Sequence, residues 1–219
     1  DWSSDVCSSD LSGRAAVPKE RLLPRTRSVL SPADLKRRTP PGQTLTDKFP
    51  ILTYGPTPTF DPGTWDFRMW GLVENEVRWS YSEFMALPPT KVVADFHCVT
   101  TWSRLDNEWE GVSFRELLTH VTPLPDAAFV MIHCDGGYTT NLSIEALVDD
   151  DVLFAYHHDG EDLDPEHGWP LRSIVPKLYA WKSAKWVRGL EFMSHDRPGF
   201  WEQNGYHMNG DPWTEERYG

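Results

Sequence analysis

Short apolar runs, partly alternating with polar residues, follow one another from residue 64 onward and are separated by turn-forming residues. Runs rich in Val, Ile, Phe and Trp that are bounded by Gly, Pro, Asp or Asn are typical of β-strands. These runs predict strands at residues 64–73, 77–80, 91–99, 127–134, 152–160, 169–176 and 184–194, the run at 152–160 ending in a turn. The pattern therefore predicts a fold dominated by β-structure.

Three short helices are expected between these strands, at residues 80–88, 113–121 and 143–151. Each begins with a serine, whose hydroxyl oxygen can accept a hydrogen bond from a free N–H of the first helical turn. Strands separated by single short helices predict a mixed, β-rich α+β domain.

The N-terminal part of the chain lacks such a pattern. Residues 1–11, DWSSDVCSSDL, have neither an apolar core nor a basic start, so we expect a non-native or artefactual lead rather than a signal peptide. Residues 12–48 are basic and rich in Pro, Ser and Thr, which predicts an extended arm. The folded domain is expected to cover residues 49–219, with an irregular tail from residue 195.

Composition narrows the class of protein. A formal net charge of −12 over 219 residues argues against general nucleic-acid binding. No run of about 18 apolar residues occurs, so no membrane span is expected. Three widely spaced cysteines do not resemble a disulfide framework, and reduced thiols fit a cytoplasmic protein. Eleven tryptophans favour a β-rich core and aromatic-walled clefts.

Basic residues are concentrated late in the chain. Residues 41–170 carry six basic and 22 acidic side chains, whereas residues 171–190 carry no acidic side chain. The basic residues of that second range are Arg172, Lys177, Lys182, Lys185 and Arg188. Such a basic island indicates either a local site for an anionic ligand or a solvated basic face, and the charge pattern alone leaves both open.

Two His–Cys dipeptides suggest metal chemistry. His97–Cys98 and His133–Cys134 would provide four nitrogen and sulfur ligands for zinc. Adjacent side chains of a strand point to opposite faces, however, so each dipeptide can direct only one residue to a common site. A zinc-stabilised binding domain is therefore the weaker alternative, and His97 is expected to point away from Cys98.

Cys98 lies where a predicted strand ends and a segment without clear periodicity, TTWSRLDNEW, begins. A thiolate at such a rigid position could bind a transition metal or act as a nucleophile. A single cysteine is more often a small apolar residue of the core. Both interpretations stay open on chemistry alone.

Two sequence blocks resemble a known family. DFHCVTTWSRLDNEWEGVSFRELL and HGWPLRSIVPKLYAWKSAKWVRGLEF are similar to the molybdopterin-binding domain of sulfite-oxidase-like oxidoreductases. The likeness is to the short bacterial type without haem or dimerisation domain, and covers roughly residues 45–215. It implies the sulfite-oxidase-type molybdopterin-binding fold and the molybdenum cofactor.

The resemblance also implies roles for particular residues. Cys98 matches the cysteine whose thiolate binds molybdenum, Arg104 loosely matches a polar residue beside the substrate oxygen, and Trp102 would form a wall. The positions that match contacts to the cofactor are Tyr54, Gly55, His167, Arg172, Ser183, Ala184 and Lys185, and more weakly Cys134, which replaces a polar residue of some relatives.

What the resemblance implies about activity is a two-electron oxo transfer on a small sulfur oxyanion or a sulfoxide, in either direction. Electrons would be exchanged with a separate electron-transfer protein. The alternative is a non-catalytic relative that keeps the fold and binds a cofactor or a partner. The oligomeric state stays open, a monomer being compatible with the sequence.

Overall fold

The computed structural model describes residues 30–219, so the expectations for residues 1–11 and most of the arm lie outside the described residues. Its contacts divide the chain into the units Asp1–Leu30 and Ser31–Gly219, and the helices and strands of the described residues all belong to the second. Its strands are β1 (Thr44–Leu45), β2 (Asp66–Gly71), β3 (Val77–Ser80), β4 (Thr90–His97), β5 (Trp102–Ser113), β6 (Phe129–Cys134), β7 (Thr139–Ser143), β8 (Leu153–His158), β9 (Glu161–Asp162), β10 (Arg172–Ile174) and β11 (Val187–Met193). Its α-helices are α1 (Pro32–Arg38), α2 (Tyr81–Met85), α3 (Phe114–Leu118), α4 (Ile144–Leu147) and α5 (Phe200–Gln203).

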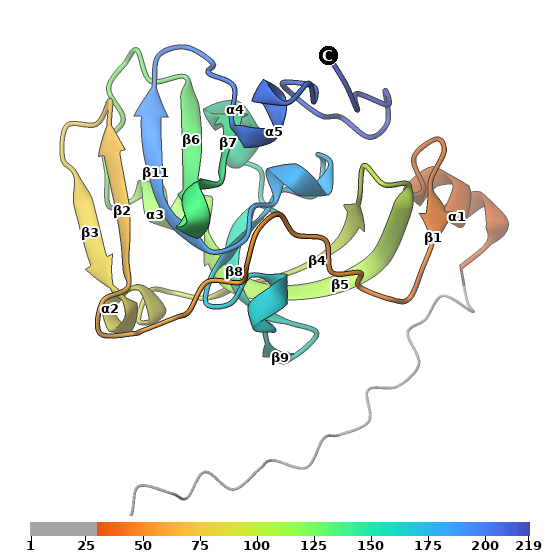
Figure 1. Ribbon diagram of the computed structural model, residues 1–219, viewed down its shortest axis with the longest axis horizontal. Helices are drawn as coiled ribbons and strands as arrows, with labels where there is room; N and C mark the ends of the chain where they lie inside the picture. Colours follow the sequence, from red (N-terminus) through yellow and green to blue (C-terminus); the bar gives the residue numbers. More distant parts are fainter. Residues whose placement is uncertain (1–29) are drawn as a thin grey trace, which may run out of the picture. The chain divides into compact units, whose positions relative to one another are not determined.

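The strands form two mixed sheets. The first has the order β1-β5-β8-β10, with β4 paired to β5 and β9 to β8, and the second has the order β3-β2-β11-β6-β7. β1 pairs with β5 and β2 with β11 in parallel, and the other pairs are antiparallel. Figure 1 shows the strands of the second sheet side by side, with β4 and β5 running across below them. The predicted β-rich α+β class with short helices is confirmed.

The main core lies between the two sheets. Phe67 of β2 and Phe154 of β8 are both fully buried, with ring centroids 5.7 Å apart. Burying a side chain of this size contributes roughly 1.5–3 kcal/mol. Because the two residues belong to different sheets, their contact holds the sheets together.

The three serine caps are confirmed. The hydroxyls of Ser80, Ser113 and Ser143 accept hydrogen bonds from backbone N–H groups at the start of α2, α3 and α4. These local hydrogen bonds fix where each short helix begins, which explains why the sequence predicted them.

The strand β5 is the largest difference from the predicted elements. Its consecutive residues Ser103, Arg104 and Leu105 are all buried, because packing covers both faces of the strand. A strand buried on both faces has no alternation of polar and apolar residues, so its sequence gave the pattern of an irregular segment. The strand β7 and the helix α5 were also not predicted.

The arm predicted at residues 12–48 is corrected where the structure describes it. Pro32–Arg38 is a helix capped by Ser31, and Thr44–Leu45 pair with β5. Arg38 donates hydrogen bonds to Asp95 at 2.6 and 2.9 Å, and also bonds Asp106. Residues 31–48 therefore pack with the domain rather than extend from it, because Arg38 bonds the carboxylates of Asp95 in β4 and Asp106 in β5.

Within the described residues, no helix is long and apolar enough to cross a membrane.

Replacing Gly111 with alanine is expected to destabilise the protein by about 3 kcal/mol, since overpacking a tight contact typically has this cost. An alanine Cβ would lie 2.0 Å from the carbonyl oxygen of Phe154, where β5 meets β8. Thermal or urea unfolding measures the loss. Gly63→Ala is the control, because its Cβ would meet only the end of the Asp61 side chain, 3.3 Å away. Equal stability of both variants would contradict this account of β5 packing.

Candidate active site

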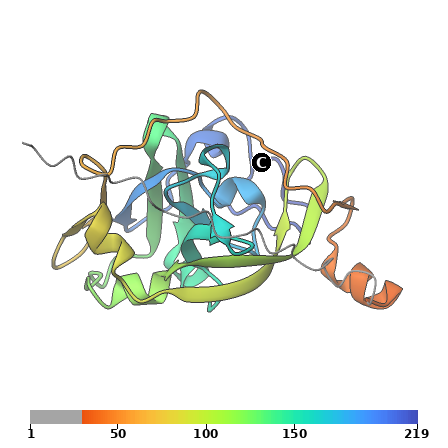
Figure 2. The same ribbon diagram turned by 90° about the horizontal axis from the view of Figure 1, so that it is seen from below.

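A cavity of about 610 Å³ lies in the domain. A volume of this size suits a small organic ligand or cofactor. Its lining residues come from residues 49–58, 96–102, 135–138, 167–186 and 200–206. The first of these segments connects β1 to β2 and runs along the upper edge of the domain in Figure 2. Segments far apart in the sequence therefore meet at one cavity.

Most of the predicted site residues line this cavity. They are Tyr54, Gly55, Cys98, Trp102, His167, Arg172, Ser183, Ala184 and Lys185. Arg104 and Cys134 do not line it. The two sequence blocks and the loop before β2 thus meet at a single cavity.

Cys98 follows the end of β4 and is held in a tight turn. Its backbone N–H donates to the carbonyl of Trp102 at 2.9 Å, and its own carbonyl accepts from the Thr101 N–H at 3.1 Å. Gln43 donates its side-chain amide to the same Cys98 carbonyl at 3.1 Å. The backbone of Cys98 is therefore fixed from two sides while its side chain faces the cavity.

The thiol of Cys98 is buried and lies 3.1 Å from the hydroxyl of Thr100. Burial raises the pKa of the thiol, and the Thr100 hydrogen bond partly opposes this effect. The thiolate would therefore form readily only beside a strong positive charge, such as a metal ion.

His97 is turned away from the cavity, as strand alternation predicted. Its Nδ1 lies 2.8 Å from the hydroxyl of Ser103, and the imidazole does not line the cavity. Burial lowers the pKa of His97 to about 4. The ring is thus neutral near pH 7 and supports the Cys98 turn from behind.

Arg172 is a buried cation without a carboxylate partner in the contacts that the structure describes. Its guanidinium donates to the carbonyl of His167 at 2.7 Å and to that of Ser183 at 3.0 Å. It lies over the rings of Phe49 and Trp109, 5.5 and 5.6 Å from their centroids. Burial lowers the pKa of Arg172 to about 9. Such a cation is expected to attract an anion into the cavity.

Lys185 adds a second positive charge beside Arg172. Its ammonium group donates to the carbonyls of Leu52 and Glu166, both at 2.8 Å. Burial, and next the charge of Arg172, lower the pKa of Lys185 to about 8. The two cations lie close because residue 168 between them is glycine, with a φ of +117°: a Cβ there would lie 3.0 Å from the Cβ of Arg172.

Two buried donors of the lining have no hydrogen-bond partner among the described residues, Nε of Arg172 and Nε1 of Trp102. Buried donors are normally paired, so the cavity is complementary to a ligand rich in acceptors. Among the described residues that line the cavity, Asp135 is the one carboxylate, and it pairs with Arg188 at 2.9 Å. These features fit an anionic, phosphate-bearing group.

The basic island divides into two parts. Only Arg172 and Lys185 line the cavity. Lys177 forms an exposed pair with Asp149, and Lys182 forms a buried pair with Glu202. Arg188 bonds two other carboxylates. The island is therefore neither a single anion site nor a simple solvated face.

The predicted place of Arg104 beside a substrate is corrected. Its guanidinium bonds Asp159 at 2.6 Å and also contacts Asn107. The ring of Phe49, which lines the cavity, lies 5.8 Å from the Arg104 guanidinium carbon. Arg104 thus packs behind Phe49, because it pairs with the carboxylate of Asp159 in the turn after β8.

Cys134 is likewise corrected. Its side chain is buried in the main core, and burial raises the pKa of its thiol well above the usual value. Of the two cysteines among the described residues, Cys98 faces the cavity and Cys134 does not, so their thiols do not share a site and the zinc alternative loses its ligand pair. Among the described residues there is also no cluster of three or more His, Cys, Asp or Glu side chains suited to a metal ion.

Aromatic residues of the lining were not predicted individually. They are Phe49, Phe96, Tyr138, Trp181, Trp186, Phe200, Trp201 and Tyr206. The signal that could have found some of them is the density of aromatic residues in the tail, FWEQNGY at residues 200–206. Their effect is a cavity with largely apolar walls and a cationic region at Arg172 and Lys185.

Anion binding to the cofactor-free protein is expected to weaken as pH rises from about 7 to about 10. Lys185, with a pKa of about 8, is charged at pH 7 and loses its charge over this range. The increase in Tm caused by pyrophosphate, measured against potassium chloride of equal ionic strength, tests this.

The stability of the anion-free protein should change with pH in the opposite direction to anion binding. A lysine whose folded-state pKa lies below its ordinary value of 10.5 opposes folding while it is charged, so without an anion stability should rise above pH 8. A pyrophosphate effect that is independent of pH would contradict the role of Lys185.

Comparison with known proteins identifies what the chain is similar to. The model of a family described as oxidoreductase molybdopterin binding domain matches residues 54–201. The oxidoreductase YuiH of Bacillus subtilis is 44% identical over 187 residues, which cover 85% of this chain and 94% of that protein.

More distant relatives are longer proteins. MsrP, the catalytic subunit of a protein-methionine-sulfoxide reductase of Gluconobacter oxydans, is 25% identical over 70% of this chain and 56% of its own length. Sulfite oxidase of Arabidopsis thaliana is 25% identical over 75% of this chain and 51% of its own length. The sulfane dehydrogenase SoxCD of Paracoccus pantotrophus shares the fold, with a TM-score of 0.59 at 20% identity over 68% of this chain and 42% of that chain.

Proposed function

The chain belongs to the oxidoreductase molybdopterin-binding domain family, and from this premise we propose that it uses a molybdenum–molybdopterin cofactor for two-electron oxygen-atom transfer. The observation that carries the proposal is the meeting of one buried cysteine and two cations, Arg172 and Lys185, that form no ion pair among the described residues, in a single cavity. The cysteine suits a soft metal, and the cations suit a phosphate.

The cofactor, when bound, supplies the metal for the two-electron step. Cys98 would provide a thiolate ligand, losing its proton to solvent as the metal binds. Arg172 and Lys185 would hold the anionic tail, with backbone groups of Ser183 and Ala184 and the ring of His167 beside them. Phe49 and Trp102 would exclude water from the site, because their rings line the cavity.

A neutral substrate, such as a sulfoxide, is favoured over a sulfur oxyanion. Trp201 and Tyr206 line the cavity with Cys98, and their rings are 4.9 Å apart. The cation whose charge acts on Cys98 is Arg217, and its guanidinium already donates to the carbonyl of Val99. Since Arg104 pairs with Asp159, the described part of the lining holds no cation, apart from Arg172 and Lys185, that favours an anionic substrate.

Electrons would be exchanged with a separate redox protein. The name of MsrP, a catalytic subunit, supports such an arrangement for this chain. The acidic net charge of −12 suggests that a partner with a basic surface would associate fastest.

The decisive experiment is expression in a host that makes the molybdenum cofactor, followed by metal analysis and by assays with dimethyl sulfoxide, methionine sulfoxide and sulfite. We expect about one molybdenum per chain and reduction of the sulfoxides with a reduced viologen dye. Molybdenum without turnover would support a non-catalytic relative. Zinc in place of molybdenum, or no metal at all, would overturn the proposal.

A further inference from the structure

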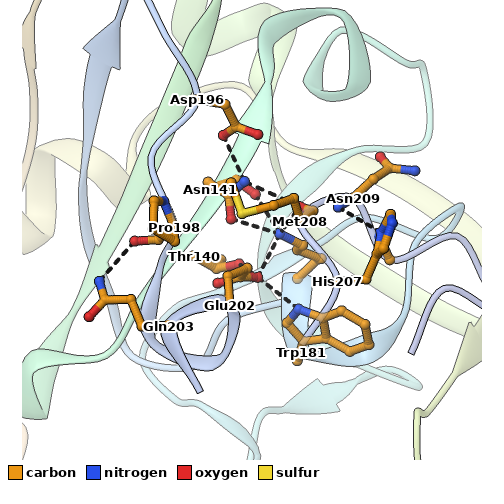
Figure 3. Close-up of polar contacts among 12 residues, drawn as sticks. Thr140, Asn141, Trp181, Asp196, Pro198, Glu202, Gln203, His207, Met208 and Asn209 are labelled. Atoms are coloured by element: carbon orange, nitrogen blue, oxygen red, sulfur yellow. Dashed lines mark hydrogen bonds and ion pairs between the residues drawn. The ribbon is translucent and has the colours of Figure 1, made fainter. Parts of the chain in front are cut away.

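Behind the cavity lies a fully buried ion pair that the proposed chemistry does not use. The ammonium group of Lys182 lies 2.6 Å from a carboxylate oxygen of Glu202, and neither side chain is exposed to solvent. The same ammonium donates to the backbone and side-chain oxygens of Asn141 and to the carbonyl of Met208, at 3.0, 2.8 and 2.6 Å. Figure 3 shows these contacts converging between β7, α5 and the C-terminal segment.

Glu202 joins a further element to this group. Its Oε1 also accepts a hydrogen bond from the indole N–H of Trp181 at 2.8 Å (Figure 3). Its Oε2 is buried without a hydrogen-bond partner among the described residues. The carboxylate is therefore oriented by Lys182 and Trp181 rather than by solvent.

The residues tied together in this way are sequence neighbours of the cavity lining. Trp181, Phe200, Trp201 and Tyr206 all line the cavity and are called the aromatic wall below. Lys182 directly follows Trp181, and Glu202 directly follows Trp201. The ion pair thus lies immediately behind the aromatic wall.

The wall is a chain of ring contacts from different elements. The centroids of Trp181 and Tyr206 are 5.1 Å apart, those of Trp201 and Tyr206 4.9 Å, and those of Phe200 and Trp201 5.1 Å. Gly210, with a φ of +83°, packs directly on Trp181, since a Cβ there would lie 2.6 Å from the indole ring. A shift of α5 or of the C-terminal segment would therefore move the rings that face the cavity.

A contribution to stability does not by itself explain why a fully buried ion pair is present here. Removing two charges from water has a large cost, and apolar replacements of similar volume often fold at least as well. The helix α5, Phe200–Gln203, is too short to be stable by itself and depends on tertiary contacts for its position. A directional ion pair fixes that position in a way that apolar packing does not.

We propose that Lys182 and Glu202 are positioning residues that hold the aromatic wall in register and thereby determine how the organic group of a neutral substrate fits beside Cys98. The proposal rests on the proposed function for the identity of the substrate. The placement of the aromatic wall does not depend on turnover, so the positioning role of the ion pair and the proposed function can be tested separately.

The test uses the cofactor-loaded protein with Glu202→Gln and with the double variant Lys182→Met/Glu202→Gln, which removes both charges at similar volume. In the double variant, we expect acrylamide to quench tryptophan fluorescence more strongly. With a reduced viologen dye, the KM for methyl p-tolyl sulfoxide should rise about 10- to 100-fold, the range expected when a hydrophobic pocket loses contact with an apolar group. The kcat should stay within about twofold, and the KM for dimethyl sulfoxide should change less, because a small substrate needs less of the wall.

The matched control is Lys91→Met/Glu110→Gln, which removes a lysine–glutamate pair 3.2 Å apart whose lysine is largely exposed. It should alter neither quenching nor KM. If the double variant folds poorly, Glu202→Gln alone tests the proposal, because it keeps the side-chain volume and an acceptor for Trp181. Its quenching by acrylamide and its KM for methyl p-tolyl sulfoxide should also rise, but by less than in the double variant.

Quenching and KM values like those of the wild type in folded variants would overturn the proposal. A kcat that falls while KM is unchanged would also overturn it, because that result assigns the pair to the chemical step. If the wild type itself holds no molybdenum or reduces no sulfoxide, the proposed function fails, and the fluorescence result alone still tests the positioning of the wall.

Discussion

Replacing Cys98 with serine is expected to lower turnover by about 1,000-fold or more, since even groups that only support a metal ligand contribute about 10- to 100-fold. Serine offers a harder oxygen donor with a much higher pKa, which suits a soft, high-valent metal site poorly. The fold should be unaffected, because the Cys98 side chain lines the cavity and the turn is held by backbone hydrogen bonds.

Activity with methionine sulfoxide, molybdenum content and thermal unfolding measure the three parts of this expectation. Cys134→Ser is the matched control, because Cys134 is a free cysteine buried in the main core. It should keep its turnover and lose about 1–3 kcal/mol of stability, the usual effect of burying an unpaired hydroxyl. Turnover of Cys98→Ser within tenfold of the wild type would show that Cys98 is not the metal ligand.

Replacing Arg172 with methionine is expected to lower cofactor affinity by about 10- to 100-fold, which corresponds to a charge-assisted hydrogen bond of about 1.5–3 kcal/mol. Methionine keeps the apolar contacts with Phe49 and Trp109, so the cavity wall is preserved. In the cofactor-free variant, loss of a buried charge without a carboxylate partner should stabilise the fold, while the carbonyls of His167 and Ser183 lose their donor, so the Tm should change little.

Molybdenum and pterin content of the purified protein, together with the Tm of the cofactor-free form, test these two expectations. Lys177→Met is the control from the same basic island, since Lys177 forms an exposed pair with Asp149 and does not line the cavity. It should retain both its cofactor and its stability. Full cofactor content in Arg172→Met would remove the electrostatic basis of the proposed site.

The secondary structure shows where sequence patterns are informative. The caps at Ser80, Ser113 and Ser143 are local hydrogen bonds within four residues, and all three helices begin where the sequence placed them. The strand β5 was missed because both of its faces are covered by distant elements. Local chemistry is visible in the sequence, whereas burial on both faces depends on partners far along the chain.

The candidate site shows the same division. Trp102 and Arg104 are separated by one residue and follow Cys98 closely, yet Trp102 lines the cavity and Arg104 does not. The difference arises from Asp159 and Phe49, which come from other parts of the chain and hold the guanidinium behind the cavity. No sequence spacing around Cys98 contains this information.

By itself, the sequence determined the β-rich class, the short capped helices and the family resemblance, and it singled out Cys98, His167, Arg172 and Lys185, which line one cavity. It could do so because these features depend on local pattern and on residue types within two blocks. Only the tertiary structure decided which cations of the basic island face the cavity, and that Lys182 is instead neutralised by Glu202. The reason is that a buried charge takes its role from the partner that the fold brings within hydrogen-bonding distance, and that partner can lie anywhere in the chain.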